Sequence, residues 1–169
     1  MQNSILVGSC GWQQLQGSGD FYPEDLPEDW QLSYYANEFP SVLVPAASWQ
    51  AESAELEDWC DEVHEGFRFY LQRDVKASAD IEKISAQAKQ QLGLQFAGFV
   101  DIEGELDSGV KLDKPSNVAL VKVKSNNLRG WREWLEENAS GLQAIFLCDE
   151  DLLYKELTEF KSLLELLNL

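Results

Sequence analysis

Short apolar segments alternate with longer amphipathic segments along most of this 169-residue chain. The short segments have the length and apolar character of buried strands, and the longer ones carry apolar residues at helical spacing. Because neighbouring parallel strands need a long crossover connection, this alternation favours a mostly parallel sheet with outer helices. The sequence predicts six strands, at Ile5–Cys10, Val42–Ala46, Phe67–Gln72, Leu94–Val100, Val118–Lys124 and Ala144–Leu147.

Turn and capping residues indicate where the intervening helices begin and end. Pro27 suits the first turn of a helix, and Gly66 and Gly93 each follow a helical segment. The helices are expected over Glu28–Phe39, Glu52–Glu65, Ser78–Leu92, Leu128–Asn138 and Asp151–Leu167.

The segment Glu103–Asn117 differs from the rest of the chain because it is acidic and contains glycine. It is the expected linker inside one domain of residues 1–169. A chain of this length with 44% hydrophobic residues has enough apolar material for a single core.

The charge balance is strongly acidic, with 30 Asp and Glu against 13 Lys and Arg and a net charge of −17. Nucleic-acid binding depends on clustered Lys and Arg, so a nucleic-acid partner is not expected. A solvated acidic face is the simplest interpretation, and mimicry of a polyanion is the alternative.

The three cysteines are too far apart in the sequence for a C-x-x-C motif, and their odd number favours free thiols in a reducing compartment. We therefore expect Cys10, Cys60 and Cys148 to be reduced and the protein to be cytoplasmic. The N-terminal residues lack the pattern of a signal peptide, and no segment has the apolar length of a membrane span.

Three motifs near the N-terminus carry a family resemblance. They are Gly8-Ser9-Cys10-Gly11-Trp12, Phe21-Tyr22-Pro23-Glu24-Asp25-Leu26-Pro27 and Tyr34-Tyr35-Ala36-Asn37-Glu38-Phe39. This opening resembles the domain of unknown function 72 (DUF72, YecE-like) family, whose members have a first strand ending in Gly-Thr-Ser-Gly-Trp, then a Phe-Tyr-Pro-x-x-Leu-Pro loop and a helix with Tyr-Tyr-Ala-x-x-Phe.

The resemblance implies a barrel of alternating strands and helices, of which this chain keeps only part. Residues 1–102 resemble the first half of the family barrel and residues 118–169 its last two β/α units, so residues 103–117 would replace the missing units. The chain is thus identified as a shortened and divergent member. The fold implied is α/β, an incomplete or degenerate TIM-barrel-like arrangement of about six mostly parallel strands with outer helices.

The same resemblance implies that the polar site of the family has been replaced here. The changed positions are Leu43 and Pro45 for a carboxylate and an amide, Gln72 for a lysine, Lys122-Val123-Lys124-Ser125 for Arg-x-His-Gly, and Cys148-Asp149 for paired asparagines. Barrel active sites lie at the C-terminal ends of strands, so these changes predict a catalytically eroded binding or scaffold protein of unknown ligand. The alternative is a small-molecule enzyme acting on an anionic substrate at the strand C-terminal mouth.

The candidate ligand-binding residues follow from this placement. They are Cys10, Trp12, Lys122, Lys124, Cys148 and Asp149, and no catalytic residue, metal ligand or cofactor is predicted. If the first and last strands are neighbours, the Cα atoms of Cys10 and Cys148 should lie on the order of 5–9 Å apart. Two small buried residues are the simpler interpretation of these cysteines.

Lys122 and Lys124 occupy alternate positions of a predicted strand, so both are expected to point into the mouth while Val121 and Val123 pack under the helices. Such a pair could hold a small anion. The alternative is that both lysines pair with the surplus acidic residues.

The last helix carries more leucines than one face can bury. Its narrow stripe consists of Leu153, Leu157, Phe160, Leu164 and Leu167, with Leu152, Leu163 and Leu166 beside it. Packing against the sheet explains the stripe, and the additional leucines suggest a homodimer through this helix.

Overall fold

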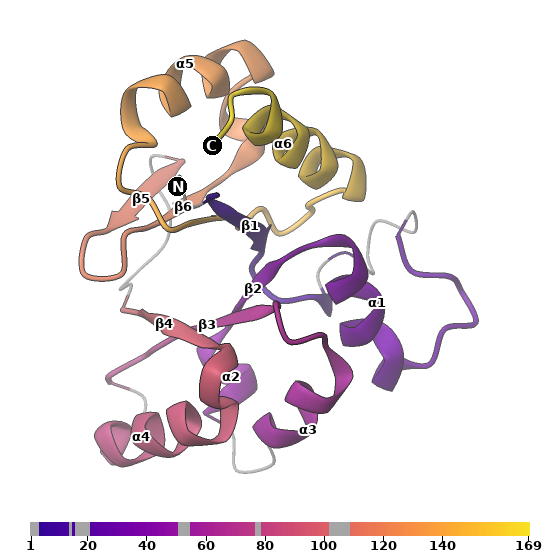
Figure 1. Ribbon diagram of the computed structural model, residues 1–169, viewed down its shortest axis with the longest axis vertical. Coiled ribbons are helices and arrows are strands. Elements are labelled where there is room, and N and C mark those ends of the chain that lie inside the picture. Colours follow the sequence, from indigo (N-terminus) through magenta and orange to yellow (C-terminus); the bar gives the residue numbers. More distant parts are fainter. Residues whose placement is uncertain (1–3, 14, 16–20, 51–54, 77–78, 102–108) are drawn as a thin grey trace.

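The computed structural model describes residues 4–13, 15, 21–50, 55–76, 79–101 and 109–169. Within these residues the protein is a mixed α/β structure in which parallel strands predominate (Figure 1). The strands are β1 (Leu6–Ser9), β2 (Ser41–Val44), β3 (Arg68–Gln72), β4 (Phe96–Val100), β5 (Val110–Asp113), β6 (Val118–Val121) and β7 (Ala144–Leu147).

The described strands form two sheets, in the orders β1-β7-β6-β5 and β2-β3-β4. Every pairing is parallel except that of β5 with β6. No closed barrel is formed by the described strands, because β4 and β5 each have one neighbour and stand at the two outer edges. The prediction of a mostly parallel sheet with outer helices is confirmed.

The two sheets meet where β1 passes β2. Cys10 and Leu43 form an isolated parallel bridge, and the Gly11 amide donates to the Leu43 carbonyl oxygen over 2.7 Å. A Cβ atom at Gly8 would collide with the carbonyl oxygen of Ser41 and with the Tyr35 hydroxyl. Glycine is therefore required at position 8 for this close approach of the two strands.

Two apolar cores lie on opposite faces of the strands. The larger core joins the strands to the helices, and the smaller one lies between the two sheets, where the rings of Tyr70 and Phe146 are 5.4 Å apart. On β6 the alternation is regular: Val118 and Leu120 belong to the smaller, inner core and Val121 to the outer one.

Helices cover the outer faces of both sheets (Figure 1). They are η2 (Glu28–Trp30), α1 (Gln31–Glu38), α2 (Ala46–Trp49), α3 (Leu56–Glu62), α4 (Ile81–Leu92), η3 (Gly93–Gln95), η4 (Val123–Ser125), α5 (Leu128–Asn138) and α6 (Tyr154–Leu166). Helices α1 to α4 lie with β2, β3 and β4, whereas α5 and α6 lie with the C-terminal strands.

β2 and β6 end clearly before their predicted C-terminal ends. β2 ends at Val44 because Pro45 has no amide hydrogen for a sheet bond and precedes α2. β6 ends at Val121 because the chain turns into η4 at Val123. Lys124 therefore does not belong to a strand.

The expected linker contains regular structure where it is described. Val110–Asp113 form β5, which pairs antiparallel with β6, and Asn117 adopts the left-handed φ of 55° in the connecting turn. Residues 103–108 of that segment lie outside the described residues, as does Ser78, the expected cap of α4.

Candidate functional site

A cleft of about 410 Å³ lies beside the C-terminal ends of β1 and β2. It is lined by Cys10, Gly11, Trp12, Gln13, Pro45, Ser48 and Trp59. Two of the predicted ligand-binding residues, Cys10 and Trp12, are in this lining. Its position at the C-terminal edge of parallel strands is where α/β folds commonly bind ligands.

Aromatic packing holds the two tryptophans of the cleft in place. The rings of Trp12 and Trp59 meet edge to face with centroids 5.1 Å apart, and Trp59 stacks on the buried Phe69 at 6.1 Å. The Tyr22 hydroxyl donates to the carbonyl oxygen of Trp12 over 2.6 Å. The cleft therefore has preformed walls, whose apolar part is formed by fixed aromatic rings.

Cys10 and Cys148, the residues that directly follow β1 and β7, form a disulfide. Their Cα atoms are 5.1 Å apart, which confirms the predicted distance and the neighbouring placement of the first and last predicted strands. The expectation that both thiols are reduced is wrong in this structure, because parallel pairing brings the two sulfur atoms within bonding distance. Cys60 is free, and burial is the main reason that its thiol pKa is raised.

Lys122 directly follows β6 and continues its extended backbone, with φ −101° and ψ 105°. Its amide donates to the carbonyl oxygen of Gly109 over 2.8 Å. Val121 and Val123 pack in the outer core under the helices, as predicted. Continuing the alternation of β6 by one residue places Lys122 on the inner side with Leu120.

Lys124 does not join Lys122 at the inner side. Its ammonium group lies 2.8 Å from the Asp151 carboxylate and 3.6 Å from that of Glu156, at the start of α6. The pKa of Lys124 is raised chiefly by the hydrogen bond that its ammonium group donates to the Asp151 carboxylate. Lys124 therefore pairs with acidic residues, as the alternative interpretation of the two lysines proposed. Lys122 and Lys124 do not form one anion site.

Asp149 is almost fully buried and serves the backbone. Its carboxylate accepts hydrogen bonds from the amides of Val123, over 2.7 Å, and Lys124, over 3.2 Å. The side chain fixes the turn after β6 to the end of β7. Its oxygens are directed at this turn and not at the cleft.

An ion pair that the sequence did not predict also lies at the C-terminal ends of two strands. Arg73 and Asp101, which follow β3 and β4, form a two-pronged ion pair with N–O distances of 2.8 and 2.6 Å. The guanidinium group also lies 4.8 Å from the ring centre of Phe99. This pair ties the edge strand β4 to β3.

An acidic hollow of about 390 Å³ adjoins the cleft and shares three of its residues. It is lined by Trp12, Gln13, Glu28, Asp29, Leu32, Glu55, Asp58, Trp59 and Glu62. The pKa of Glu55 is raised by its hydrogen bond with Asp58 and by the nearby negative charges. The pKa of Glu62 is raised first by burial and then by Asp29 and Asp58.

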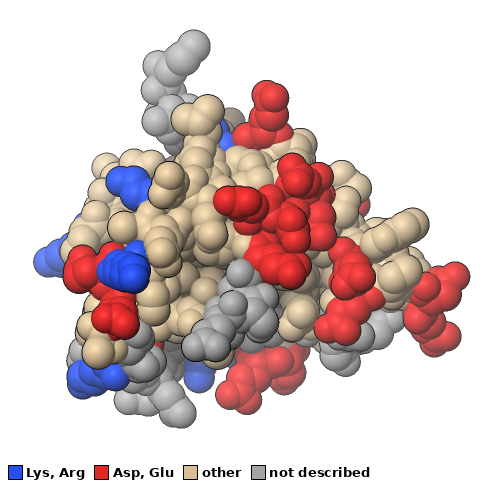
Figure 2. All heavy atoms as spheres, turned by 90° about the horizontal axis from the view of Figure 1, so that it is seen from below, with Lys and Arg blue, Asp and Glu red and all other residues tan. Residues whose placement is uncertain are grey.

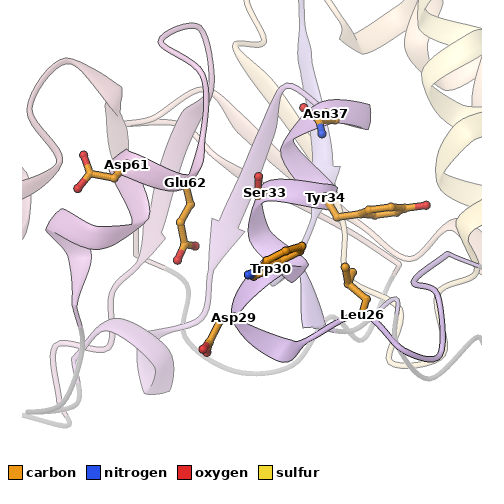
Figure 3. A pocket seen from close by; sticks show the side chains of 8 residues that line it. All are labelled: Leu26, Asp29, Trp30, Ser33, Tyr34, Asn37, Asp61 and Glu62. Carbon is orange, nitrogen blue, oxygen red and sulfur yellow. The ribbon is translucent and has the colours of Figure 1, made fainter.

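A further hollow of about 490 Å³ lies between α1 and α3 (Figure 3). It shares Asp29 and Glu62 with the acidic hollow. Its lining includes Trp30, whose side chain is 64% exposed. In Figure 3 the Glu62 carboxylate points into the space between the two helices, whereas the Asp61 carboxylate points away from it.

The charge distribution over the surface is uneven. Figure 2 shows acidic side chains gathered over one part of the face seen from below, with Lys and Arg toward the opposite side. Across the described residues, no group of three or more His, Cys, Asp or Glu side chains could hold a metal ion.

The sequence did not predict several residues of this region: Asp29, Trp30, Ser48, Trp59 and Glu62. The sequence predicts only that Trp59 lies within the helix Glu52–Glu65 and that the acidic residues form a general solvated face. Their meeting depends on the packing of η2 and α1 against α3, which no local spacing indicates. The only signal for this site in the sequence was the placement of Cys10, Cys148 and Asp149 at the C-terminal ends of the first and last predicted strands.

In the part of the chain that the structure describes, no helix combines the length and apolar character needed to cross a membrane. No curated protein matches this sequence. A DUF72 family protein from Thermotoga maritima has a similar fold, with a TM-score of 0.55, 12% identity, and coverage of 96% of this chain and 100% of the other. A DUF72 family protein from Enterococcus faecalis gives a TM-score of 0.49 at 10% identity, covering 99% of each chain.

The family comparison covers the N-terminal part of the chain, including the three motifs of its opening. The model of the family described as "Protein of unknown function DUF72" matches residues 6–104, which is more than half of the sequence. The chain belongs to the DUF72 family.

Proposed function

We propose that this chain is a binding protein for an amphipathic cation, a ligand with an aromatic or apolar body and an amine or guanidinium group. One observation carries the proposal: the aromatic cleft and the acidic hollow share Trp12, Gln13 and Trp59. A ligand in the cleft can therefore reach the carboxylates without leaving the protein surface.

The cleft suits the apolar body of such a ligand. Trp12, Pro45 and Trp59 supply flat or rigid apolar surface, and both tryptophan rings are held by neighbouring groups. Rings fixed before binding lose little conformational entropy when a ligand packs on them.

The adjoining hollow suits the positive charge. The pKa of Glu55 is raised by its hydrogen bond with Asp58 and by repulsion from nearby carboxylates, and the pKa of Glu62 is raised by burial and then by repulsion from Asp29 and Asp58. A cationic group placed among them relieves that repulsion and is attracted in turn. Trp30 adds an exposed ring face for a cation where the hollow continues between α1 and α3.

Binding without catalysis is supported by the positions that replace the polar residues of relatives. Leu43 is buried in the inner core, Pro45 is an apolar wall of the cleft, and Asp149 is held by two backbone amides. We take the fold to be an incomplete TIM-barrel-like form whose catalytic face has eroded, in a cytoplasmic protein. The enzyme alternative with an anionic substrate is disfavoured because Lys124 is paired with acids and the cleft opens onto carboxylates.

Calorimetric titration with three probes at low salt tests this function. Tryptamine has both an aromatic body and an ammonium group, indole-3-propionate has the body with a negative charge, and spermidine has charge without an aromatic body. We expect saturable tryptamine binding and affinities about tenfold weaker or worse for the other two. Equal or tighter binding of indole-3-propionate, or no binding of tryptamine, would overturn the proposal.

Two double variants that remove the same number of negative charges distinguish attraction of tryptamine by the hollow from attraction by the net charge of the protein. Asp29→Asn/Glu62→Gln removes two carboxylates of the hollow, and Glu133→Gln/Glu137→Gln removes two exposed carboxylates of α5. Tryptamine binding should weaken severalfold in the first variant alone. An identical loss in both variants would mean that only the net charge attracts the probe.

A further inference from the structure

The Cys10–Cys148 disulfide has an asymmetric environment. Cys10 is part of the lining of the 410 Å³ cleft, and Cys148 is not. Both residues are partly exposed, unlike the fully buried residues that precede them on β1 and β7. A small molecule in the cleft can therefore approach the sulfur atom of Cys10 first.

A lysine stands next to the other sulfur-bearing residue. Val121 and Leu147 are register partners, and the Cys148 amide donates to the Val121 carbonyl oxygen over 2.8 Å. Lys122 directly follows Val121, and Cys148 directly follows Leu147, at the ends of these two neighbouring strands. Since neighbouring strands lie about 4.8 Å apart, alternation brings both onto the inner side, following Leu120 and Phe146.

The described residues provide no ion pair for Lys122, whereas Lys124 is bound to Asp151. A free ammonium group beside a cysteine lowers the pKa of its thiol and makes the thiolate a better leaving group. The other ionisable groups on elements around Cys148 are Asp149, held by two amides, Tyr70 of the inner core, Lys111 opposite Leu120 on β5, and the Arg73–Asp101 pair.

We propose that the Cys10–Cys148 disulfide is a thiol–disulfide exchange site for low-molecular-weight thiols, with Cys10 attacked from the cleft and Cys148 released beside Lys122. This activity goes beyond ligand binding in the cleft and does not depend on it. The two cysteines and Lys122 then act as one group across β1, β7 and β6.

The exchange balances in two steps. A thiolate RS⁻ attacks Cys10 Sγ, the bond between Cys10 Sγ and Cys148 Sγ breaks, and Cys148 leaves as a thiolate that takes up the proton lost by RSH. A second thiolate RS⁻ then attacks the R-bearing sulfur of the Cys10 mixed disulfide, the bond from that sulfur to Cys10 Sγ breaks, and Cys10 leaves as a thiolate that takes up the proton lost by the second RSH, which gives RSSR and two reduced cysteines. Two electrons pass from two thiols to the protein disulfide, and oxidation by RSSR runs the same steps in reverse.

The first test follows exchange in the folded protein, in a Cys60→Ser background that removes the free thiol. The protein is equilibrated with cysteamine and cystamine at varied ratios, quenched with a maleimide and analysed by mass spectrometry, while circular dichroism monitors the fold. We expect reversible reduction with native structure retained and cysteamine attached at Cys10 in the trapped intermediate. Reduction only after addition of urea, attachment at Cys148 alone, or failure of the disulfide to form in cystamine would overturn the proposal.

The second test measures the thiol pKa of Cys148 by its ultraviolet thiolate absorbance in a Cys10→Ser/Cys60→Ser protein. Lys122→Met should raise this pKa by about one unit, and Lys122→Arg should preserve it. Lys124→Met is the matched control, because Lys124 is held at the start of α6, and it should leave the pKa unchanged. An unchanged pKa in Lys122→Met, or equal shifts in Lys122→Met and Lys124→Met, would refute the assigned role of Lys122.

Discussion

The phenolic hydroxyl of Tyr35 donates a hydrogen bond to the carbonyl oxygen of Ser41 over 2.8 Å. The same hydroxyl accepts from the Ser9 amide over 2.9 Å, so a helix side chain links β1 to β2 where the strands share little direct pairing. Tyr35 is fully buried, and burial raises its pKa far above the usual value.

Tyr35→Phe should lower the free energy of unfolding by about 1–3 kcal/mol, because a buried amide and carbonyl lose their partner. Urea unfolding followed by circular dichroism measures the change. Tyr154→Phe is the control: its hydroxyl contacts an exposed Glu38 carboxylate at 3.2 Å, and its loss should cost less than about 1 kcal/mol. Equal effects of the two variants would show that the Tyr35 link adds no special stability.

Cys10→Ser/Cys148→Ser should lower the free energy of unfolding by about 2–4 kcal/mol under oxidising conditions. The bond closes a loop with a sequence separation of 138 residues, which greatly restricts the unfolded chain. Reducing agent should remove most of the difference between the variant and the parent protein, and Cys60→Ser should be neutral within about 1 kcal/mol. A difference that persists undiminished under reducing conditions would assign it to packing and not to the disulfide.

Asp149→Asn should destabilise the fold by about 1.5–3 kcal/mol. The carboxylate accepts two backbone hydrogen bonds after β6, and an amide can replace only one of its oxygens as an acceptor. Hydrogen exchange at the amides of Val123 and Lys124 should accelerate in the same variant. Glu150→Gln removes the same charge from an exposed neighbour and should change neither quantity.

Glu62→Gln should stabilise the protein at pH 7 by a few tenths of a kcal/mol up to about 1. The pKa of Glu62 is raised in the folded state, so its ionisation on going from acid to neutral pH weakens folding relative to the unfolded chain. The gain should be full at pH 7 and vanish below about pH 4, where the carboxyl is protonated in both states. Thermal unfolding across this range checks the sign, and a gain that is constant with pH would reject repulsion as its cause.

A homodimer through α6 stays a prediction. Leu157, Phe160 and Leu164 are buried within the protein, whereas Leu153 is 36% and Leu166 79% exposed. If α6 forms the contact, Leu166→Glu should convert a dimer to a monomer in light scattering coupled to size-exclusion chromatography. A dimer of unchanged stability in this variant would place the contact elsewhere, and Leu94→Glu, at another exposed leucine, is the matched control.

The strand order could be inferred from sequence largely because its signals are local. Short apolar runs marked β1, β2, β3 and β7, with Gly11 closing the first, and their alternation with helices predicted parallel pairing. The neighbouring placement of Cys10 and Cys148 followed from the family resemblance. β5 was missed because Val110–Asp113 alternate apolar and charged residues inside a stretch whose acidity resembled a linker.

The site could be predicted only in part, for a different reason. Whether Lys124 faces the inner core depends on how the chain turns after β6, and Asp149, from the segment that follows β7, accepts the hydrogen bonds of that turn. The acidic hollow likewise joins Asp29 and Glu62, which are far apart in the sequence, through the packing of η2 against α3. Neither arrangement has a period or spacing that a single sequence displays.

The position of β1 also governs the order in which this chain can fold. β1 leaves the ribosome before the other described strands, but its ladder partner is β7, which follows all of them in the sequence. The ladder Leu6–Ser9 with Ala144–Leu147 cannot form until nearly the whole sequence has been synthesised, and such distant pairing slows folding. A nascent chain stopped before β7 therefore keeps one edge of its first strand unpaired, which exposes it to capture by chaperones or by other nascent chains.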